Sequence, residues 1–331
     1  MEYISIPLQK IFPDKELPGD IYLYINEKYL KYRHAGDLIE ACKYNYFMAQ
    51  NVESIFVETS CFSEFNYWAN KVREEDANQT IKELGEDNKD FVEANMETRE
   101  LIIATFTKDE IDDEAVKQLS SQAEKVIDML EKKKAEIAKI ALAKLSKWNS
   151  SIGDHSTSVA NLSVFLAGVC GQSHRAVLED LYLGAMLHDF GKTKIPAKVL
   201  ENPGSATYND QILRHPELGR TLLDGKGLSD RVLKIVVEHH EQHDGNGYPN
   251  KLNGKKIYSL SKIVAIANGF VDSFVEGKEQ NMKDVQAYKK ALKAVELGSS
   301  RLYDPEMVKP ILKALRMSFE ENIDTLPHDE L

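Results

Sequence analysis

The placement of the histidines constrains this chain more than any other feature. Seven of the nine histidines fall between His155 and His243 in a sequence of 331 residues. One of them, His188, is followed directly by Asp189 in the segment LHDFGK, residues 187–192. Imidazole and carboxylate groups together bind transition metals. The sequence therefore predicts a fold that brings distant helices together at one metal site.

The carboxylate of Asp189 has two oxygens and can bridge two metal ions. Two ions that share a water lower its pKa and make it a nucleophile near neutral pH. Lys192 follows Asp189 by three residues, so both would face the same side of a continuing helix. A lysine ammonium can hold a phosphate oxygen as a point charge. These parts predict hydrolysis of a phosphate ester, with Asp189 and Lys192 as catalytic residues.

Each candidate ligand also has an ordinary structural interpretation. His188 and Asp189 can form a hydrogen-bonded pair in the core. The adjacent His239 and His240 can lie at an exposed helix end, and their side chains point about 100° apart if both are helical. His155 can cap a helix or lie in the core. All of these interpretations at once are improbable, so the metal site is the prediction.

The bulk composition argues against binding to nucleic acid polymers or membranes. The formal net charge is −11, and nonspecific nucleic-acid binding depends on Lys and Arg that neutralise phosphates. The three cysteines lie far apart, which is typical of a reducing compartment. The start resembles no signal peptide, and no apolar run is long enough to cross a bilayer. We expect a soluble cytoplasmic protein.

The chain divides into three segments of different pattern. Residues 1–62 predict a small α/β regulatory domain, residues 63–149 a helical connector, and residues 150–331 an all-helical catalytic domain with Pro/Gly-containing loops. The expected fold class is therefore mainly α. In the first segment we expect strands at Tyr3–Leu8, Ile21–Ile25 and Ser54–Val57 and a helix at Leu38–Gln50.

The connector carries a heptad-like apolar pattern. Such spacing has two interpretations: one amphipathic helix packed on its own domain, or a homodimer-forming helix that transmits a signal. Lys133 interrupts the pattern. The apolar positions are Val116, Leu119, Ala123, Val126, Leu130, Ile137 and Ile140.

The motifs of the last segment resemble those of the HD-GYP family, in the same order and at the family's spacing. The resemblance runs from Ser150 to Met317 and implies a member of the HD superfamily of metal-dependent phosphohydrolases. It implies hydrolysis of the bacterial second messenger cyclic di-GMP to pGpG, and often onward to GMP. The matching residues are His188-Asp189-Phe190-Gly191-Lys192, Ile195-Pro196, His215, Gly219, Leu222-Leu223, His239-His240-Glu241 and Asp244-Gly245-Asn246-Gly247-Tyr248-Pro249.

The resemblance also implies a role for each matching polar residue. Lys192 would contact the substrate phosphate. The metals would be iron, or manganese as second choice, although the residues alone also suit zinc and nickel. The expected ligands are His155 and His188 for the first metal, Asp189 for both, and His215, His239 and His240 for the second.

The signature loop Gly247-Tyr248-Pro249 is linked in the family more to structure and partner docking than to bond breaking. Two arrangements of Tyr248 are compatible with the sequence. The ring can lie exposed on the loop, where it would contact a protein partner, or it can pack beneath the loop and stabilise it.

The sequence departs from the family pattern at four single positions, and the Arg-Pro-Tyr that normally follows the segment with Asn268 is absent. Asn268 and Val271 replace the two aspartates of the segment after the signature loop, Gln242 replaces an arginine, and Ser151 replaces a glutamate that holds a third metal in some members. We therefore expect two metals, with Asn268 as a weaker, neutral ligand of the first. The departures leave two alternatives to turnover of cyclic di-GMP. One is a degenerate HD-GYP module that binds nucleotide or a protein partner with little or no turnover, and the other is a phosphohydrolase for another nucleotide.

Overall fold

The computed structural model describes residues 2–40, 54–106, 110–132, 152–196 and 205–323, together with residues 43, 44, 47, 52 and 199. The chain forms two compact units. The first holds residues 1–92 and 195–209, and the second holds residues 93–194 and 210–331. Among the described residues, no helix combines the length and apolar character that crossing a membrane requires. The predicted mainly α fold class is confirmed, whereas the predicted domain boundaries stay a prediction.

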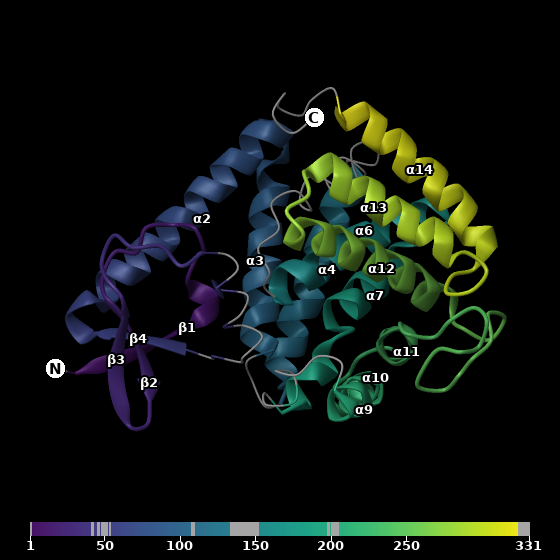
Figure 1. The fold of residues 1–331 in the computed structure, drawn as a ribbon. Helices are drawn as coiled ribbons and strands as arrows, with labels where there is room; N and C mark the ends of the chain where they lie inside the picture. The colour runs from purple at the N-terminus through teal and green to yellow at the C-terminus, as the bar shows by residue number, and fades with distance from the viewer. Residues whose placement is uncertain are drawn as a thin grey trace. The chain divides into compact units, whose positions relative to one another are not determined.

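The first unit contains a four-stranded antiparallel sheet in the order β1-β4-β2-β3 (Figure 1). One face is apolar because every second residue of β4, Ile55 and Val57, points into the core. Phe65 of the following helix is also buried in this cluster. The elements are β1 (Tyr3–Pro7), η1 (Leu8–Lys10), β2 (Ile21–Ile25), β3 (Lys28–Arg33), β4 (Ser54–Glu58), η2 (Thr59–Cys61), α2 (Phe62–Leu84) and η3 (Glu86–Asn88).

The three strands predicted from the sequence are confirmed, and a fourth was missed. β3 forms a hairpin with β2 through Asn26 and Glu27, both of which have positive φ. A two-residue turn with positive φ at both positions matches the right-handed twist of the strands. Most of the helix predicted at Leu38–Gln50 lies outside the described residues, although Lys43, Tyr44 and Phe47 are helical.

The second unit is helical, and its helices pack around α6, α7 and α12 (Figure 1). Helix α6 packs between α7 and α12, α11 packs on α7, and α13 and α14 follow as outer helices. The helices are α3 (Lys89–Phe106, of which the first four residues belong to the first unit), α4 (Asp113–Lys132), α6 (Ile152–Val169), α7 (Arg175–Leu187), η5 (Phe190–Lys194), α9 (Ala206–Ile212, of which the first four residues also belong to the first unit), α10 (His215–Leu223), α11 (Asp230–Glu238), α12 (Ser259–Glu279), α13 (Asp284–Gly298) and α14 (Pro305–Ile323).

The apolar positions of the heptad pattern that the structure describes are buried against other helices of the same chain. The apolar positions from Val116 to Leu130 are buried on α4, which packs on α7. This arrangement favours the interpretation of an amphipathic helix packed on its own domain. Ile137 and Ile140 lie outside the described residues, and dimer formation stays a prediction.

Candidate metal centre

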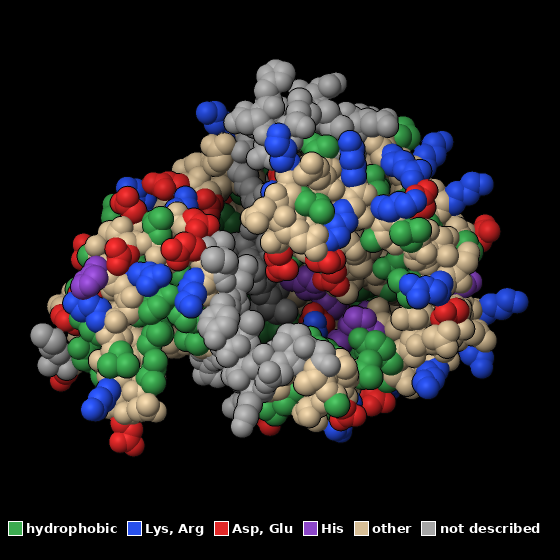
Figure 2. Space-filling model, viewed as in Figure 1, with side chains coloured by type: hydrophobic (Ala, Val, Ile, Leu, Met, Phe, Trp, Pro, Cys, Tyr) green, Lys and Arg blue, Asp and Glu red, His purple; other side chains and the backbone are tan. Residues whose placement is uncertain are grey.

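The fold brings together the histidines that the sequence singled out. His155 lies on α6, His188 and Asp189 form the turn after α7, His215 begins α10, and the last pair follows α11. These residues form two groups. Within each group the possible ligand atoms all lie within 4.8 Å of one another, and Asp189 belongs to both groups. In Figure 2, histidine side chains gather on one face of the molecule beside acidic side chains. The groups are Asp189, His215, His239 and His240, and His155, His188 and Asp189.

Three of the imidazoles are oriented in the same way. The Nδ1 atoms of His188, His215 and His239 lie 2.5–2.7 Å from the carbonyl oxygen of the residue three positions earlier. Carbonyl groups at helix ends have no intrahelical partner, so they can accept such a bond. A carbonyl only accepts, so each Nδ1 carries the hydrogen. Each Nε2 is then left with a lone pair directed into the site.

These lone pairs face one another across short distances. His215 Nε2 lies 3.1 Å from His239 Nε2, and His155 Nε2 lies 3.3 Å from His188 Nε2. With the hydrogen of His188, His215 and His239 on Nδ1, the first of these pairs has no proton to share. Two lone pairs that face each other without a proton repel. A cation between the nitrogens removes this repulsion, and imidazole nitrogens are good ligands for a transition metal ion. The donor set therefore fits transition metal ions.

The two oxygens of Asp189 face different groups. Oδ1 lies 3.2 Å from His215 Nε2, and Oδ2 lies 3.4 Å from His188 Nε2. Within the described part of the chain, Oδ1 is buried and receives no hydrogen bond. Burial alone would raise the pKa of Asp189, but the nearby Lys192 ammonium and the imidazoles hold it well below its usual range. Asp189 is therefore an anion with one oxygen turned toward each group.

Lys192 reaches Asp189 by a route that the sequence did not predict. Helix α7 does not continue; it ends at Leu187 and is followed by the 3-10 helix η5. Residues three apart are eclipsed in a 3-10 helix, and Lys192 Nζ lies 2.6 Å from Asp189 Oδ2. The Lys192 side chain is 35% exposed. It therefore pairs with the central carboxylate and also reaches solvent.

Burial keeps several imidazoles neutral. It lowers the pKa of His155 to about 3 and holds the pKa of His239 and of His240 well below the ordinary value, with the neighbouring histidines acting in the same direction. A neutral imidazole is the form that binds metal.

Two glycines allow the turn after α7 to meet α10. A Cβ atom at Gly191 would lie 1.9 Å from the carbonyl oxygen of His215 and 2.5 Å from the amide nitrogen of Gly219. No side chain can be accommodated at that distance. Gly191 thus lets the segment that carries Asp189 approach the helix that carries His215.

The signature loop packs on the metal site. The Tyr248 ring stacks on His240 with a centroid distance of 4.7 Å and an interplanar angle of 20°. Tyr248 is half-buried, so neither arrangement considered from the sequence describes it fully. Gly247 lies against the backbone of Glu241. The buried Glu241 carboxylate accepts hydrogen bonds from two amides of the following segment, Asn250 at 2.7 Å and Leu252 at 2.8 Å.

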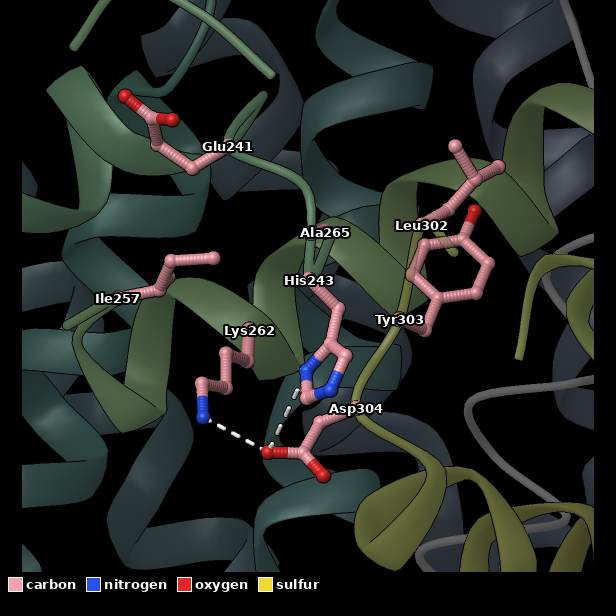
Figure 3. Close-up of a pocket in the computed structure, with 8 residues that line it drawn as sticks. All are labelled: Glu241, His243, Ile257, Lys262, Ala265, Leu302, Tyr303 and Asp304. Atoms are coloured by element: carbon pink, nitrogen blue, oxygen red, sulfur yellow. Dashed lines mark hydrogen bonds and ion pairs between the residues drawn. The ribbon is translucent and has the colours of Figure 1, made fainter. Parts of the chain in front are cut away.

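A small cavity lies beside this loop, with a volume of about 10 Å³. Figure 3 shows the Lys262 ammonium and the His243 imidazole both directed toward the Asp304 carboxylate, at 2.7 and 4.0 Å. Tyr303, which also lines the cavity, packs against the backbone of α12 because Gly269 has no side chain. The cavity holds at most about one water. The residues Lys262, His243 and Asp304 join α12 to the segment before α14 and lie outside the predicted ligand set.

Helix α12 contributes two polar residues near His155. Asn268 is buried, and its Nδ2 donates a hydrogen bond of 3.1 Å to Asp272 Oδ2. Asp272 Oδ1 lies 3.6 Å from His155 Nδ1. Val271, the second departure from the family pattern, is completely buried in the core. Sequence reasoning missed Asp272, although its place one helical turn after Asn268 was a usable signal.

The connector helix α3 contacts both sides of the first ligand group. Arg99 Nε donates a hydrogen bond of 2.9 Å to Asp154, the residue before His155. Phe106 packs edge-to-face on Phe190, the residue after Asp189, with a centroid distance of 5.2 Å. Helix α3 therefore packs against both segments that carry the first ligand group.

Comparison with known proteins agrees with this geometry. A family model described as HD domain matches residues 150–307. The His-Asp pair and the Gly-Tyr-Pro loop both lie inside the match. This region is an HD domain. The structure of Bd1817, a HDG"Y"P protein from Bdellovibrio bacteriovorus, superposes with a TM-score of 0.61 at 18% identity and covers 95% of this chain and 100% of that chain. This likeness shows that the fold is shared.

Two curated relatives are similar in sequence to part of this chain. The cyclic di-GMP phosphodiesterase response regulator RpfG of Xanthomonas campestris pv. campestris is 35% identical over 137 residues, which are 40% of this chain and 35% of the relative. A cyclic di-GMP phosphodiesterase of Thermotoga maritima is 34% identical over 163 residues, which are 48% of this chain and 43% of the relative. The match thus spans less than half the length of either relative.

Proposed function

We propose that this protein is a metal-dependent phosphodiesterase that hydrolyses cyclic di-GMP to pGpG, GMP or both. The observation that carries the proposal is the placement of the Asp189 oxygens, one toward each group of imidazole lone pairs. Such a carboxylate suits two ions that act together. The names of the two curated relatives support cyclic di-GMP as the substrate.

The proposed first metal would be held by His155, His188 and Asp189, with Asn268 as a weak further ligand, and the second by Asp189, His215, His239 and His240. Bound ions would lower the pKa of a water and neutralise charge on the phosphoryl oxygens. The Nδ1–H bonds to backbone carbonyls fix the imidazole orientations. Iron is the preferred metal and manganese the second choice.

Lys192 is proposed to bind the substrate phosphate. Its side chain is partly exposed and lies at the Oδ2 side of Asp189. An ammonium there stabilises negative charge as it develops on a phosphoryl oxygen. Since a charged ammonium has no lone pair, Lys192 is not a metal ligand in that form.

The second candidate is an HD-GYP module that binds nucleotide or a partner without efficient turnover. Asn268 favours it, because a neutral amide replaces a charged ligand. Val271 weakens the case for a base on this part of α12, since its side chain is an apolar core residue.

A turnover assay separates the two candidates. The protein is loaded anaerobically with Fe²⁺, or separately with Mn²⁺, and incubated with cyclic di-GMP; 3′3′-cGAMP serves as a comparison substrate. We expect pGpG or GMP to form, and formation to be lost in Asp189→Ala. Binding of cyclic di-GMP without product, by metal-loaded parent protein, supports the second candidate. The protein partner at the signature loop, the homodimer and the cytoplasmic location stay predictions.

A further inference from the structure

Asp272 is a carboxylate near the predicted first metal site that the sequence assigned no role. It lies on α12, one turn after Asn268, and contacts two predicted ligands. Its Oδ1 is 3.6 Å from His155 Nδ1, and its Oδ2 accepts a hydrogen bond of 3.1 Å from Asn268 Nδ2. Burial raises the pKa of the Asp272 carboxyl to about 6, with the Lys192 ammonium and the His188 imidazole acting in the opposite direction, although 58% of the side chain is exposed.

His155 differs from the other oriented imidazoles in what faces its Nδ1. His188, His215 and His239 lie at helix ends and use a backbone carbonyl three residues earlier. His155 lies within α6, and the carboxylate of Asp272 on α12 lies beside its Nδ1 at 3.6 Å. Asp272 occupies the corresponding place beside the ring. A carboxylate on the far nitrogen of a metal-binding histidine fixes the ring and raises its basicity.

The same carboxylate orients the Asn268 amide. Since Nδ2 donates to Asp272, the amide oxygen is turned away from that contact. Within the described residues this oxygen is buried and no donor meets it in hydrogen-bond geometry, although the Asn268 side chain lies close enough to His155 to act on the pKa of that imidazole. A buried oxygen without a donor is costly. It is also a ligand in need of a cation, and the neighbouring His155 belongs to the first ligand group.

We propose that Asp272 is the outer carboxylate of the first metal site, where it holds His155 through Nδ1 and directs the oxygen of Asn268 toward the metal. This inference rests on the metal centre proposed above. It assigns Asp272 a positioning role and not a ligand role, because the first ligand group lies within 4.8 Å without Asp272.

The charge pattern of α12 supports this assignment. An aspartate at position 268 would place two carboxylates four residues apart on one helix, which is an unfavourable arrangement. With Asn268, the same contact is a hydrogen bond. The negative charge that the family pattern places in the ligand shell is thus retained here one helical turn away, at Asp272.

Metal affinity tests the proposal, with Mn²⁺ as the probe and a competing chelator. The variants are Asp272→Asn and, as a matched control, Glu276→Gln. Glu276 lies on the same helix one turn further on, its side chain is 60% exposed, and its substitution removes the same charge. Asp272→Asn should weaken the weaker-bound ion by roughly 10- to 100-fold, the usual effect of losing such an outer partner. The tighter ion and the control should be unaffected.

Asn268→Asp provides a second, independent readout. It should tighten the weaker site more in the Asp272→Asn background than in the parent, because the like-charge contact is then absent. Equal effects in both backgrounds, or equal Mn²⁺ affinities of parent and Asp272→Asn, would overturn the proposal. If the parent itself binds no Mn²⁺, the metal centre and the proposed function fail instead. Nitrogen NMR of the Zn²⁺-loaded protein should show Nδ1–H on His155 in the parent, with a changed Nδ1 signal in Asp272→Asn.

Discussion

Replacing Gly191 with alanine should separate the two halves of the metal centre. The added Cβ would lie 1.9 Å from the carbonyl oxygen of His215 and 2.5 Å from the amide nitrogen of Gly219. Both obstacles are backbone atoms, so no side-chain rotation relieves the contact. The two segments must move apart by about 1 Å before the contact becomes tolerable in a close-packed interior.

That displacement is large compared with what a metal site tolerates. Ligand distances in protein sites hold to within about 0.2 Å of their preferred values. Asp189 lies two residues before Gly191, and His215 moves with its own carbonyl. We therefore expect Gly191→Ala to lose the second metal and to destabilise the protein by about 1–3 kcal/mol, the usual cost of overpacking.

The assay combines metal content by elemental analysis with thermal unfolding of the metal-free protein. Gly168→Ala is the matched control, because Gly168 lies on helix α6 and a Cβ there meets no atom within 4 Å. That control should keep both metals and gain about 0.5–1 kcal/mol from reduced chain entropy. Full metal occupancy and unchanged unfolding of Gly191→Ala would refute the reasoning.

Three further predictions concern the loop and Lys192. Tyr248→Ala removes the ring stacked on His240 and should cost about 0.5–1.5 kcal/mol in unfolding free energy or binding of the second metal, whereas Tyr248→Phe keeps the stacked ring and should lose less in both measurements. Glu241→Ala leaves two loop amides without their acceptor, so hydrogen exchange across residues 250–252 should accelerate. Unchanged exchange would contradict a stabilising role for the hydrogen bonds from these amides to Glu241. Lys192→Met should keep the metal content but lower affinity for inorganic phosphate about tenfold, the loss of one charge-assisted hydrogen bond. Undiminished phosphate binding would refute the proposed role of Lys192 in binding substrate phosphate and would leave its ion pair with Asp189 as its function.

Much of the candidate ligand set could be predicted because the sequence supplied it in order. The His-Asp pair and the later histidines match a family spacing, and the fold places them together. Local patterning also predicted three strands correctly. The hairpin strand β3 was missed because its turn, Asn26-Glu27, lacks the glycine that usually marks positive φ.

What the sequence could not predict depends on contacts between distant segments. The packing of Arg99 and Phe106 against the metal-binding segments requires knowing how α3 lies on the domain. The stacking of Tyr248 on His240 depends on how the loop folds back. The sequence places Asp272 one helical turn after Asn268, but its distance to His155 depends on how α12 packs on α6.

The central claim is that Asp189 bridges two metal ions, one in each ligand group. Anomalous diffraction from crystals loaded with Mn²⁺ and collected near the manganese absorption edge tests it most directly. The account predicts two anomalous peaks, one between Asp189 and His188 and the other between Asp189 and His215. A single peak, or two peaks of which only one contacts Asp189, would contradict it.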